Sequence, residues 1–164
     1  MKMTKVLLAS WIIAAAFLLN GLTEVQGAEE LIVVATKATQ EATQNWQAFL
    51  KTKEVPFKLM TPQEFATNKN HKYVVIMGSM DESEDVKNLL KEVLNDNDMN
   101  FISQEGNGKM FLRPNVWMSG QRVLIFAGSS REAEIEARKA SRDEWFEHLA
   151  DWFDIETAEG LRSY

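Results

Sequence analysis

Two short turns hold the residues of this sequence that are best suited to bind a ligand. Each turn follows an apolar segment and precedes a helical pattern, and together they contain Gly78 and Ser79 in one, and Gly128, Ser129, Ser130 and Arg131 in the other. Backbone amides at the start of a helix, together with a guanidinium, can hold a phosphate or a carboxylate. Neither turn is a GxGxxG motif or a P-loop, and Ser129 or Ser130 with Glu132 also matches ordinary helix capping. Capping is therefore the simpler interpretation, and an anion site is the alternative.

Trp117 is the other residue whose chemistry points to a ligand. It lies in a stretch of turn-forming residues between two predicted strands. An exposed indole there could stack on a sugar or contact a neighbouring subunit. The alternative is an indole that folds back over the core as a lid. The sequence is compatible with both arrangements.

The remaining candidates for catalysis or metal binding have ordinary explanations. An acidic cluster could attract calcium, but negative charge is also favoured in the first turn of a helix: Asp81, Glu82, Glu84 and Asp85. His71 and His148 lie outside HExxH and GxSxG motifs, and the chain has no cysteine. We therefore expect no catalytic residue, no metal site and no cofactor, and a protein that is not an enzyme.

The elements that must position these residues alternate between apolar strands and amphipathic helices. Strands are predicted at residues 31–35, 55–60, 73–77, 109–112 and 121–126. Helices are predicted to start at Thr39 and Thr61, to cover 86–94 with an end at 95–100, and to run from Ser130 to Phe153. This order predicts an α/β fold. We expect a three-layer βαβ sandwich with a mainly parallel sheet and a β-hairpin before the C-terminal helix.

The first 27 residues have the pattern of an export signal. Lys2 and Lys5 precede an apolar run at 6–19, and small residues stand close to Gly27. We expect cleavage after Gly27, which leaves residues 28–164 as a single domain with a core at 29–153 and a tail at 154–164. A retained anchor is the alternative, but the apolar run is shorter than the roughly 20 residues that span a bilayer.

The balance of charge limits the partners. The chain has a formal net charge of −6, and removal of the signal peptide would make it one charge more negative. Nucleic acids and anionic lipids attract basic surfaces, so neither is an expected partner, and we expect no stable membrane span after cleavage. Without cysteine, an exported domain has no disulfide and must be held by its core alone.

Four segments together resemble the α/β module of archaeal surface-layer proteins. They are Tyr73–Gly78, Gly106–Phe111, Pro114–Trp117 and Val123–Arg131, with Ala137 in the helix that follows. A weaker similarity links the same pattern to the non-catalytic periplasmic subunit of bacterial cellulose synthase. The resemblance implies a structural or interaction role at the cell surface, without catalysis. The Gly-Gly-Pro-x-x-Asn turn of that family is replaced here by Gly78 to Asp81.

These observations lead to one expected function and two alternatives. We expect a secreted or cell-surface protein, located in a periplasm-like space or outside the cell, that acts as a non-catalytic structural or interaction module. Its expected partner is an envelope protein or a polysaccharide, and self-association into a homo-oligomer is a further expectation. The alternatives are a small-ligand or glycan-binding accessory domain, and an enzyme that uses the Gly78 and Gly128 turns with Arg131 as an anion contact.

Overall fold

Five strands form one mixed sheet in a computed structural model that describes residues 29–155. The strands are β1 (Leu31–Val34), β2 (Phe57–Met60), β3 (Tyr73–Ser79), β4 (Gly108–Pro114) and β5 (Arg122–Gly128), in the spatial order β2-β1-β3-β5-β4. β4 runs antiparallel to β5, and the other neighbours are parallel. The predicted α/β fold and its hairpin are therefore confirmed. The predicted signal peptide and residues 156–164 of the predicted tail lie outside the described residues.

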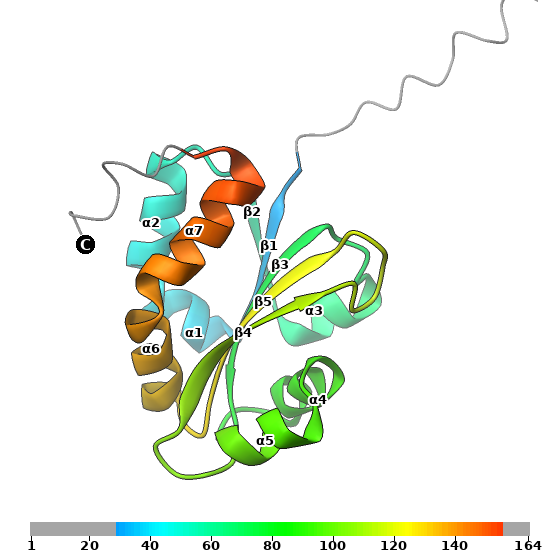
Figure 1. Cartoon of the computed structure of the whole chain (residues 1–164), viewed down its shortest axis with the longest axis vertical. Coiled ribbons are helices and arrows are strands. Elements are labelled where there is room, and N and C mark those ends of the chain that lie inside the picture. The colour runs from blue at the N-terminus through cyan, green and yellow to red at the C-terminus, as the bar shows by residue number, and fades with distance from the viewer. Residues whose placement is uncertain (1–28, 156–164) are drawn as a thin grey trace, which may run out of the picture.

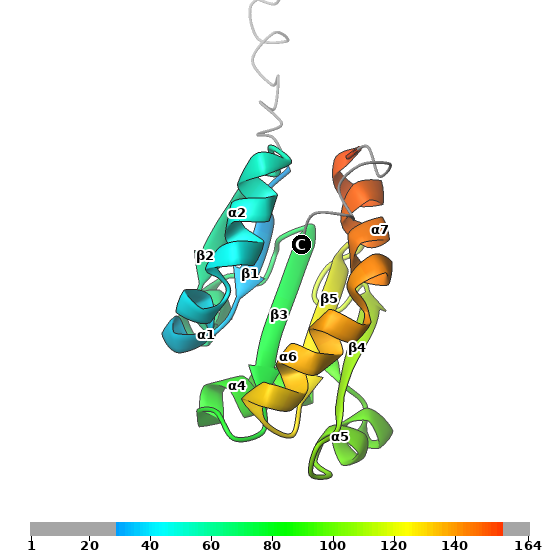
Figure 2. The same cartoon turned by 90° about the vertical axis from the view of Figure 1, so that its left-hand side faces the viewer.

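Seven helices in this part of the chain cover the two faces of the sheet (Figures 1 and 2). One face carries α1 (Lys37–Ala42), α2 (Gln44–Thr52), α6 (Arg131–Ala140) and α7 (Arg142–Phe153). The opposite face carries α3 (Pro62–Thr67), α4 (Glu84–Val93) and α5 (Asp96–Ile102). This arrangement is the expected three-layer sandwich. Its edges are β2 and β4 (Figure 2).

Each face of the sheet has its own apolar core, because successive side chains of a strand point to opposite faces. In β3, Val75 and Met77 join the core under α2 and α7, whereas Val74 and Ile76 join the core under α3, α4 and α5. All seven residues of β3 are buried. A strand buried on both faces has a nearly continuous apolar sequence. This explains why the central strands were predictable.

Two predicted helices are each interrupted at a single residue. The first helix begins at Lys37, because the side chain of Thr36 accepts a hydrogen bond from the Thr39 N–H, and it breaks at Thr43. The C-terminal helix breaks at Ser141. At both breaks a hydroxyl donates to a backbone carbonyl three or four residues earlier, and ψ is close to 20°. Such bonds compete with the regular helix, so the prediction of continuous helices was wrong.

Several other boundaries differ from prediction by a few residues, and the start of α3 is confirmed. The helix predicted at 86–94 does end at Val93, but another helix follows that was not predicted, because the Asn95 side chain accepts from the Asp98 N–H and starts α5. β2 begins two residues later than predicted, since the Val55 N–H donates to the Leu50 carbonyl and closes the end of α2. The predicted start of α3 is confirmed by a reciprocal capping box between Thr61 and Glu64.

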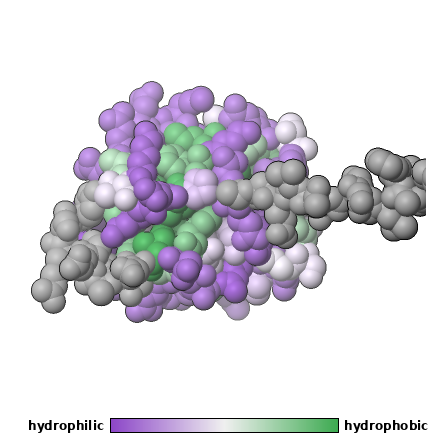
Figure 3. Space-filling view, turned by 90° about the horizontal axis from the view of Figure 1, so that it is seen from above, coloured by the Kyte–Doolittle hydropathy of each residue, from purple (hydrophilic) through white to green (hydrophobic). Residues whose placement is uncertain are grey.

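The end of the molecule at which β1 begins has a mixed surface. Hydrophilic residues surround an apolar area in the view from this end (Figure 3). Partly buried apolar side chains pack against the core on the α2 and α7 face, and they include Phe57, Phe153 and Ile155.

Within residues 29–155, no helix combines the length and apolarity needed to cross a bilayer.

Candidate functional site

The carboxyl ends of β1, β3 and β5 meet at one edge of the sheet, and this edge is the candidate site. The chain passes from β1 outward to β2 and then returns to β3 on the other side of β1. The strand order therefore reverses between β1 and β3, the place where open α/β sheets bind ligands. The two predicted turns lie side by side here, because Ser79 is in register with Gly128 and the Met80 N–H donates to the Gly128 carbonyl at 2.9 Å.

The carboxylate of Glu82 fills the point at which the strand order reverses. Its Oε1 accepts hydrogen bonds from the hydroxyls of Thr36 at 2.7 Å and Thr39 at 2.8 Å. Its Oε2 accepts from the backbone N–H of Ser79 at 3.0 Å. Only 10% of the side chain is exposed. Three donors from two different turns thus converge on one carboxylate that belongs to the chain itself.

Arg131 is also engaged within the molecule. Its Nη2 donates to the Thr39 hydroxyl at 3.0 Å and lies 3.5 Å from Glu82 Oε1. About a third of the arginine side chain, 34%, is exposed. Because Arg131 already faces an internal carboxylate, the geometry gives little support to an external anion at this position. The expected anion contact is instead part of the Glu82 network.

The glycines of both turns are explained by close packing of helices on the sheet. A Cβ atom added at Gly78 would lie 2.5 Å from the Val86 side chain of α4. A Cβ added at Gly128 would lie 2.4 Å from the backbone nitrogen of Glu134 in α6. Real Cβ contacts are not this short, so any larger residue would push a helix away. Neither glycine needs a ligand to account for it.

The side chains of Ser79 and Ser130 have partners within the molecule, whereas that of Ser129 has none among the described residues. The Ser130 side chain accepts from the Ala133 N–H at 3.3 Å and caps α6, so the capping interpretation is confirmed. The Ser79 hydroxyl donates to Asp81 at 2.6 Å. The backbone N–H of Ser129 donates to the Asn107 carbonyl at 2.8 Å, while its hydroxyl is buried without a partner among the described residues.

A second buried carboxylate lies behind this edge, in α6. Glu134 is 2% exposed, and it accepts a hydrogen bond from Arg138 Nε at 3.1 Å. Burial raises the pKa of Glu134 above its usual range, although the positive charge of Arg138 opposes this shift. Sequence reasoning did not single out Glu134, because a glutamate in the first turn of a helix usually lies in solvent.

Trp117 folds back over the core. Its ring meets Phe65 edge to face at a centroid distance of 5.2 Å, and Lys69 Nζ lies 5.4 Å from the ring centroid. The indole N–H donates to the carboxylate of Glu92 at 3.3 Å. Trp117 is partly buried and packs against the core under α3 and α4. The arrangement is the lid that the sequence left as an alternative to an exposed indole.

Gln121 holds the loop of Trp117 in place. This glutamine is fully buried, and its Nε2 donates to the carbonyls of Lys69 at 2.9 Å and His71 at 2.8 Å. Its Oε1 accepts from the Trp117 N–H at 3.0 Å. One side chain thereby joins two loops that are far apart in the sequence. No local signal distinguishes it from a solvated polar residue ahead of a strand.

The structure shows where the acidic residues lie that the sequence suggested as calcium ligands. The predicted acidic cluster is divided, because Glu82 turns inward whereas Glu84 and Asp85 begin α4. Asp98 forms an ion pair with Arg113 of β4. Within residues 29–155, no group of three or more histidine, aspartate or glutamate side chains is arranged to hold a metal ion.

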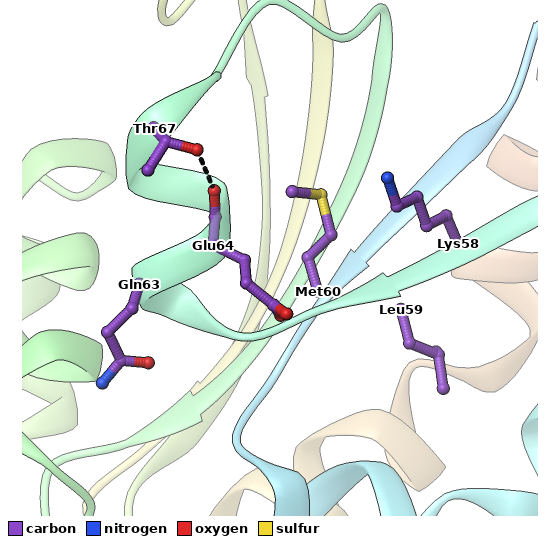
Figure 4. Close-up of a pocket in the computed structure, with 6 residues that line it drawn as sticks. All are labelled: Lys58, Leu59, Met60, Gln63, Glu64 and Thr67. Atoms are coloured by element: carbon purple, nitrogen blue, oxygen red, sulfur yellow. Dashed lines mark hydrogen bonds between the residues drawn. The ribbon is translucent and has the colours of Figure 1, made fainter.

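A shallow pocket of about 410 Å³ lies beside the edge strand β2 (Figure 4). Strand β2 and helix α3 supply its lining, which consists of Lys58, Leu59, Met60, Gln63, Glu64 and Thr67. The Glu64 carboxylate accepts from the N–H and hydroxyl of Thr61, which lower the pKa of Glu64. Gln63 donates to Asp85 of α4. The pocket therefore offers few polar groups that are free to orient a ligand.

Comparisons with protein-family models, curated proteins and solved structures yield no match for this chain. The resemblance to surface-layer proteins and to the cellulose synthase subunit therefore stays a prediction. The described geometry defines the chain no further than an α/β protein whose ligand-binding edge is occupied by its own Glu82.

Proposed function

We propose that this chain is a non-catalytic interaction module that acts outside the cytoplasm, at the cell envelope. The observation that carries the proposal is the Glu82 network at the carboxyl ends of β1 and β3. This edge is where an α/β protein of this topology would place a small ligand. Here it is filled by a carboxylate whose donors are Thr36, Thr39, Ser79 and Arg131.

The energetic argument follows from the burial of that carboxylate. An external anion would have to displace Glu82 and leave its charge with fewer partners, which costs the desolvation energy of a nearly buried carboxylate. The network is therefore better suited to hold together the chain segments that follow β1, β3 and β5 than to exchange ligands. The proposed location rests on the lysines, apolar run and small residues of the first 27 residues.

The proposal is tested by measuring partners and small ligands with the same protein. We expect the purified protein to bind a component of the envelope fraction, either a protein or a polysaccharide, and to retain this binding after Arg131→Ala. Arg122→Ala is the matched control, because Arg122 also pairs with a carboxylate but lies far from the Glu82 network, at the start of β5.

Two results would contradict the proposed function. One is a protein that stays monomeric and binds neither envelope protein nor polysaccharide. The other is a small ligand that raises the melting temperature of the wild type and of Arg122→Ala but not that of a folded Arg131→Ala. The second result would favour the alternative of a ligand-binding protein or an enzyme at the Gly78 and Gly128 turns.

A further inference from the structure

We propose that the free edge of β4 is a docking site for an extended, acidic strand of another protein, which would add to the sheet beside β4. This inference rests on the proposed role as an interaction module and names the surface and the partner for that role. Strand addition of this kind gains affinity from backbone hydrogen bonds and specificity from alternate side chains.

The hydrogen bonds of β4 show which backbone groups face away from the sheet. The Asn115 N–H donates to the Gln121 carbonyl, and the Ser129 N–H donates to the Asn107 carbonyl. Asn107 and Asn115, the residues on either side of β4, therefore direct these backbone groups toward β5. In an antiparallel pair the direction alternates with each residue, so the backbone groups of Gly108, Met110 and Leu112 face the free edge. Such groups are a template for another strand.

The two exposed large apolar side chains of the described residues belong to β4 and to α5, the helix that packs on it. They are Leu112 in β4, which is 39% exposed, and Phe101 in α5, which is 40% exposed. Leu112 shares a face of the strand with Met110, on the side of α6 and α7, whereas α5 covers the opposite face. Leu112 would therefore offer an apolar contact to a strand added beside β4.

The charges of β4 determine the chemistry of the partner. Lys109 and Arg113 flank Phe111 on the α5 side of the strand, with their cationic groups 5.6 Å and 5.4 Å from its ring centroid. Lys109 is exposed and has no carboxylate partner among the described residues. Opposite charges on directly opposed strand residues are stabilising. Arg113 is already paired with Asp98 of α5, so Lys109 is the cation that a partner would meet. A fitting strand thus carries an acidic residue opposite Lys109 and an apolar residue opposite Phe111.

A second copy of the chain fits this edge less well. β4 contains no acidic residue, so a second copy would place no carboxylate of this strand opposite Lys109 in any register. In a two-fold pairing centred on Phe111, Lys109 would face Arg113 instead. One end of the strand is also partly blocked, because Arg113 Nη1 donates to the Leu112 carbonyl at 3.0 Å and Pro114 has no N–H. A partner strand would therefore pair with the free backbone groups of Gly108 and Met110 and with the Leu112 N–H.

The test uses a labelled seven-residue peptide and the purified full-length protein. The peptide has glutamate at its second and sixth positions, so that one of them meets Lys109 in either strand direction, and valine at its third, fourth and fifth. Binding is followed by fluorescence anisotropy. We expect saturable binding that is at least tenfold weaker for Lys109→Glu. The matched control is Lys51→Glu, an exposed charge reversal on α2, which should bind as the wild type does. A peptide with lysine in place of both glutamates should not bind.

A third peptide separates strand addition from simple charge attraction. N-methylation of alternate amides should abolish binding when the methyl groups face β4 and leave it unchanged when they face away. The proposal is overturned by absent binding, by equal binding of the lysine peptide, or by equal losses for Lys109→Glu and Lys51→Glu. It is also overturned if sedimentation shows a dimer that Leu112→Asp dissociates, since a second copy would then occupy the edge. Envelope binding that survives Lys109→Glu would overturn this site and leave the proposed function standing.

Discussion

Replacing Glu82 by glutamine tests whether the network at the carboxyl edge of the sheet is structural. The substitution keeps the size of the side chain and removes its charge. The carboxylate accepts from two hydroxyls at 2.7 and 2.8 Å and from one backbone N–H at 3.0 Å. In glutamine one of the two oxygens becomes an NH₂ group, which cannot accept from these donors.

The expected loss follows from those contacts. A hydrogen bond to a charged group contributes about 1.5–3 kcal/mol and one to a neutral group about 1 kcal/mol, so losing the charge at three nearly buried contacts should cost about 2 kcal/mol. The 3.5 Å contact with Arg131 is long and partly exposed, and we assign it no additional energy. For a domain of this size, about 2 kcal/mol corresponds to a fall in melting temperature of about 8 °C.

The assay is urea unfolding at pH 7, followed by tryptophan fluorescence. Glu84→Gln is the matched control, because Glu84 lies two residues further on with 67% of its side chain exposed, and its stability should stay within about 0.5 kcal/mol of the wild type. Equal stability of the two variants would refute the reasoning. So would a Glu82→Gln variant more stable than the wild type, because a carboxylate held at a cost to stability is typical of a functional site.

Three further substitutions test other parts of the account. Gly128→Ala should cost about 2–4 kcal/mol in urea unfolding, because its Cβ meets the backbone of α6, whereas Gly106→Ala, with a φ of 78° and open space around it, should cost only about 1 kcal/mol. Burial raises the pKa of Glu134, so ionisation of this carboxyl destabilises the fold. The unfolding free energy of the wild type relative to Glu134→Gln should therefore fall as the pH rises above about 4.5, and a constant difference would contradict this. Trp117→Ala should lower stability by about 2–3 kcal/mol through lost packing on Phe65, whereas loss of polysaccharide retention at unchanged stability would instead favour the glycan-binding alternative.

The helix boundaries illustrate how far local sequence could be used. The Thr61-Pro62-x-Glu64 pattern predicted the start of α3, because the capping box depends on residues that are neighbours in the sequence. The interruptions at Thr43 and Ser141 were not predicted, although serine and threonine are known to bond backbone carbonyls within a helix. Whether such a bond breaks a helix depends on how the two halves pack, and this was not visible in the sequence.

The sequence predicted where the candidate site lies but not how its side chains are arranged. The glycine-serine turns were expected beyond the ends of parallel strands, and Ser79 and Gly128 are indeed in register there. The residue that occupies this place, Glu82, was assigned to a solvated helix start. Its inward direction is decided by Thr36 and Thr39, which come from a turn more than forty residues earlier in the chain. Long-range hydrogen bonds of this kind leave no periodic pattern.

The sequence by itself determined the α/β class, the buried strands, the hairpin and the caps at Thr61 and Ser130, because each depends on residues close together in the chain. Only the tertiary structure decided the roles of the two turns that first suggested a ligand. It assigned Gly78 and Gly128 to helix packing and Arg131 to an internal carboxylate. It also placed Trp117, in the loop before β5, as a lid over Phe65. The physical reason is that burial and charge pairing depend on tertiary contacts, and these contacts are made between residues that are distant in the sequence.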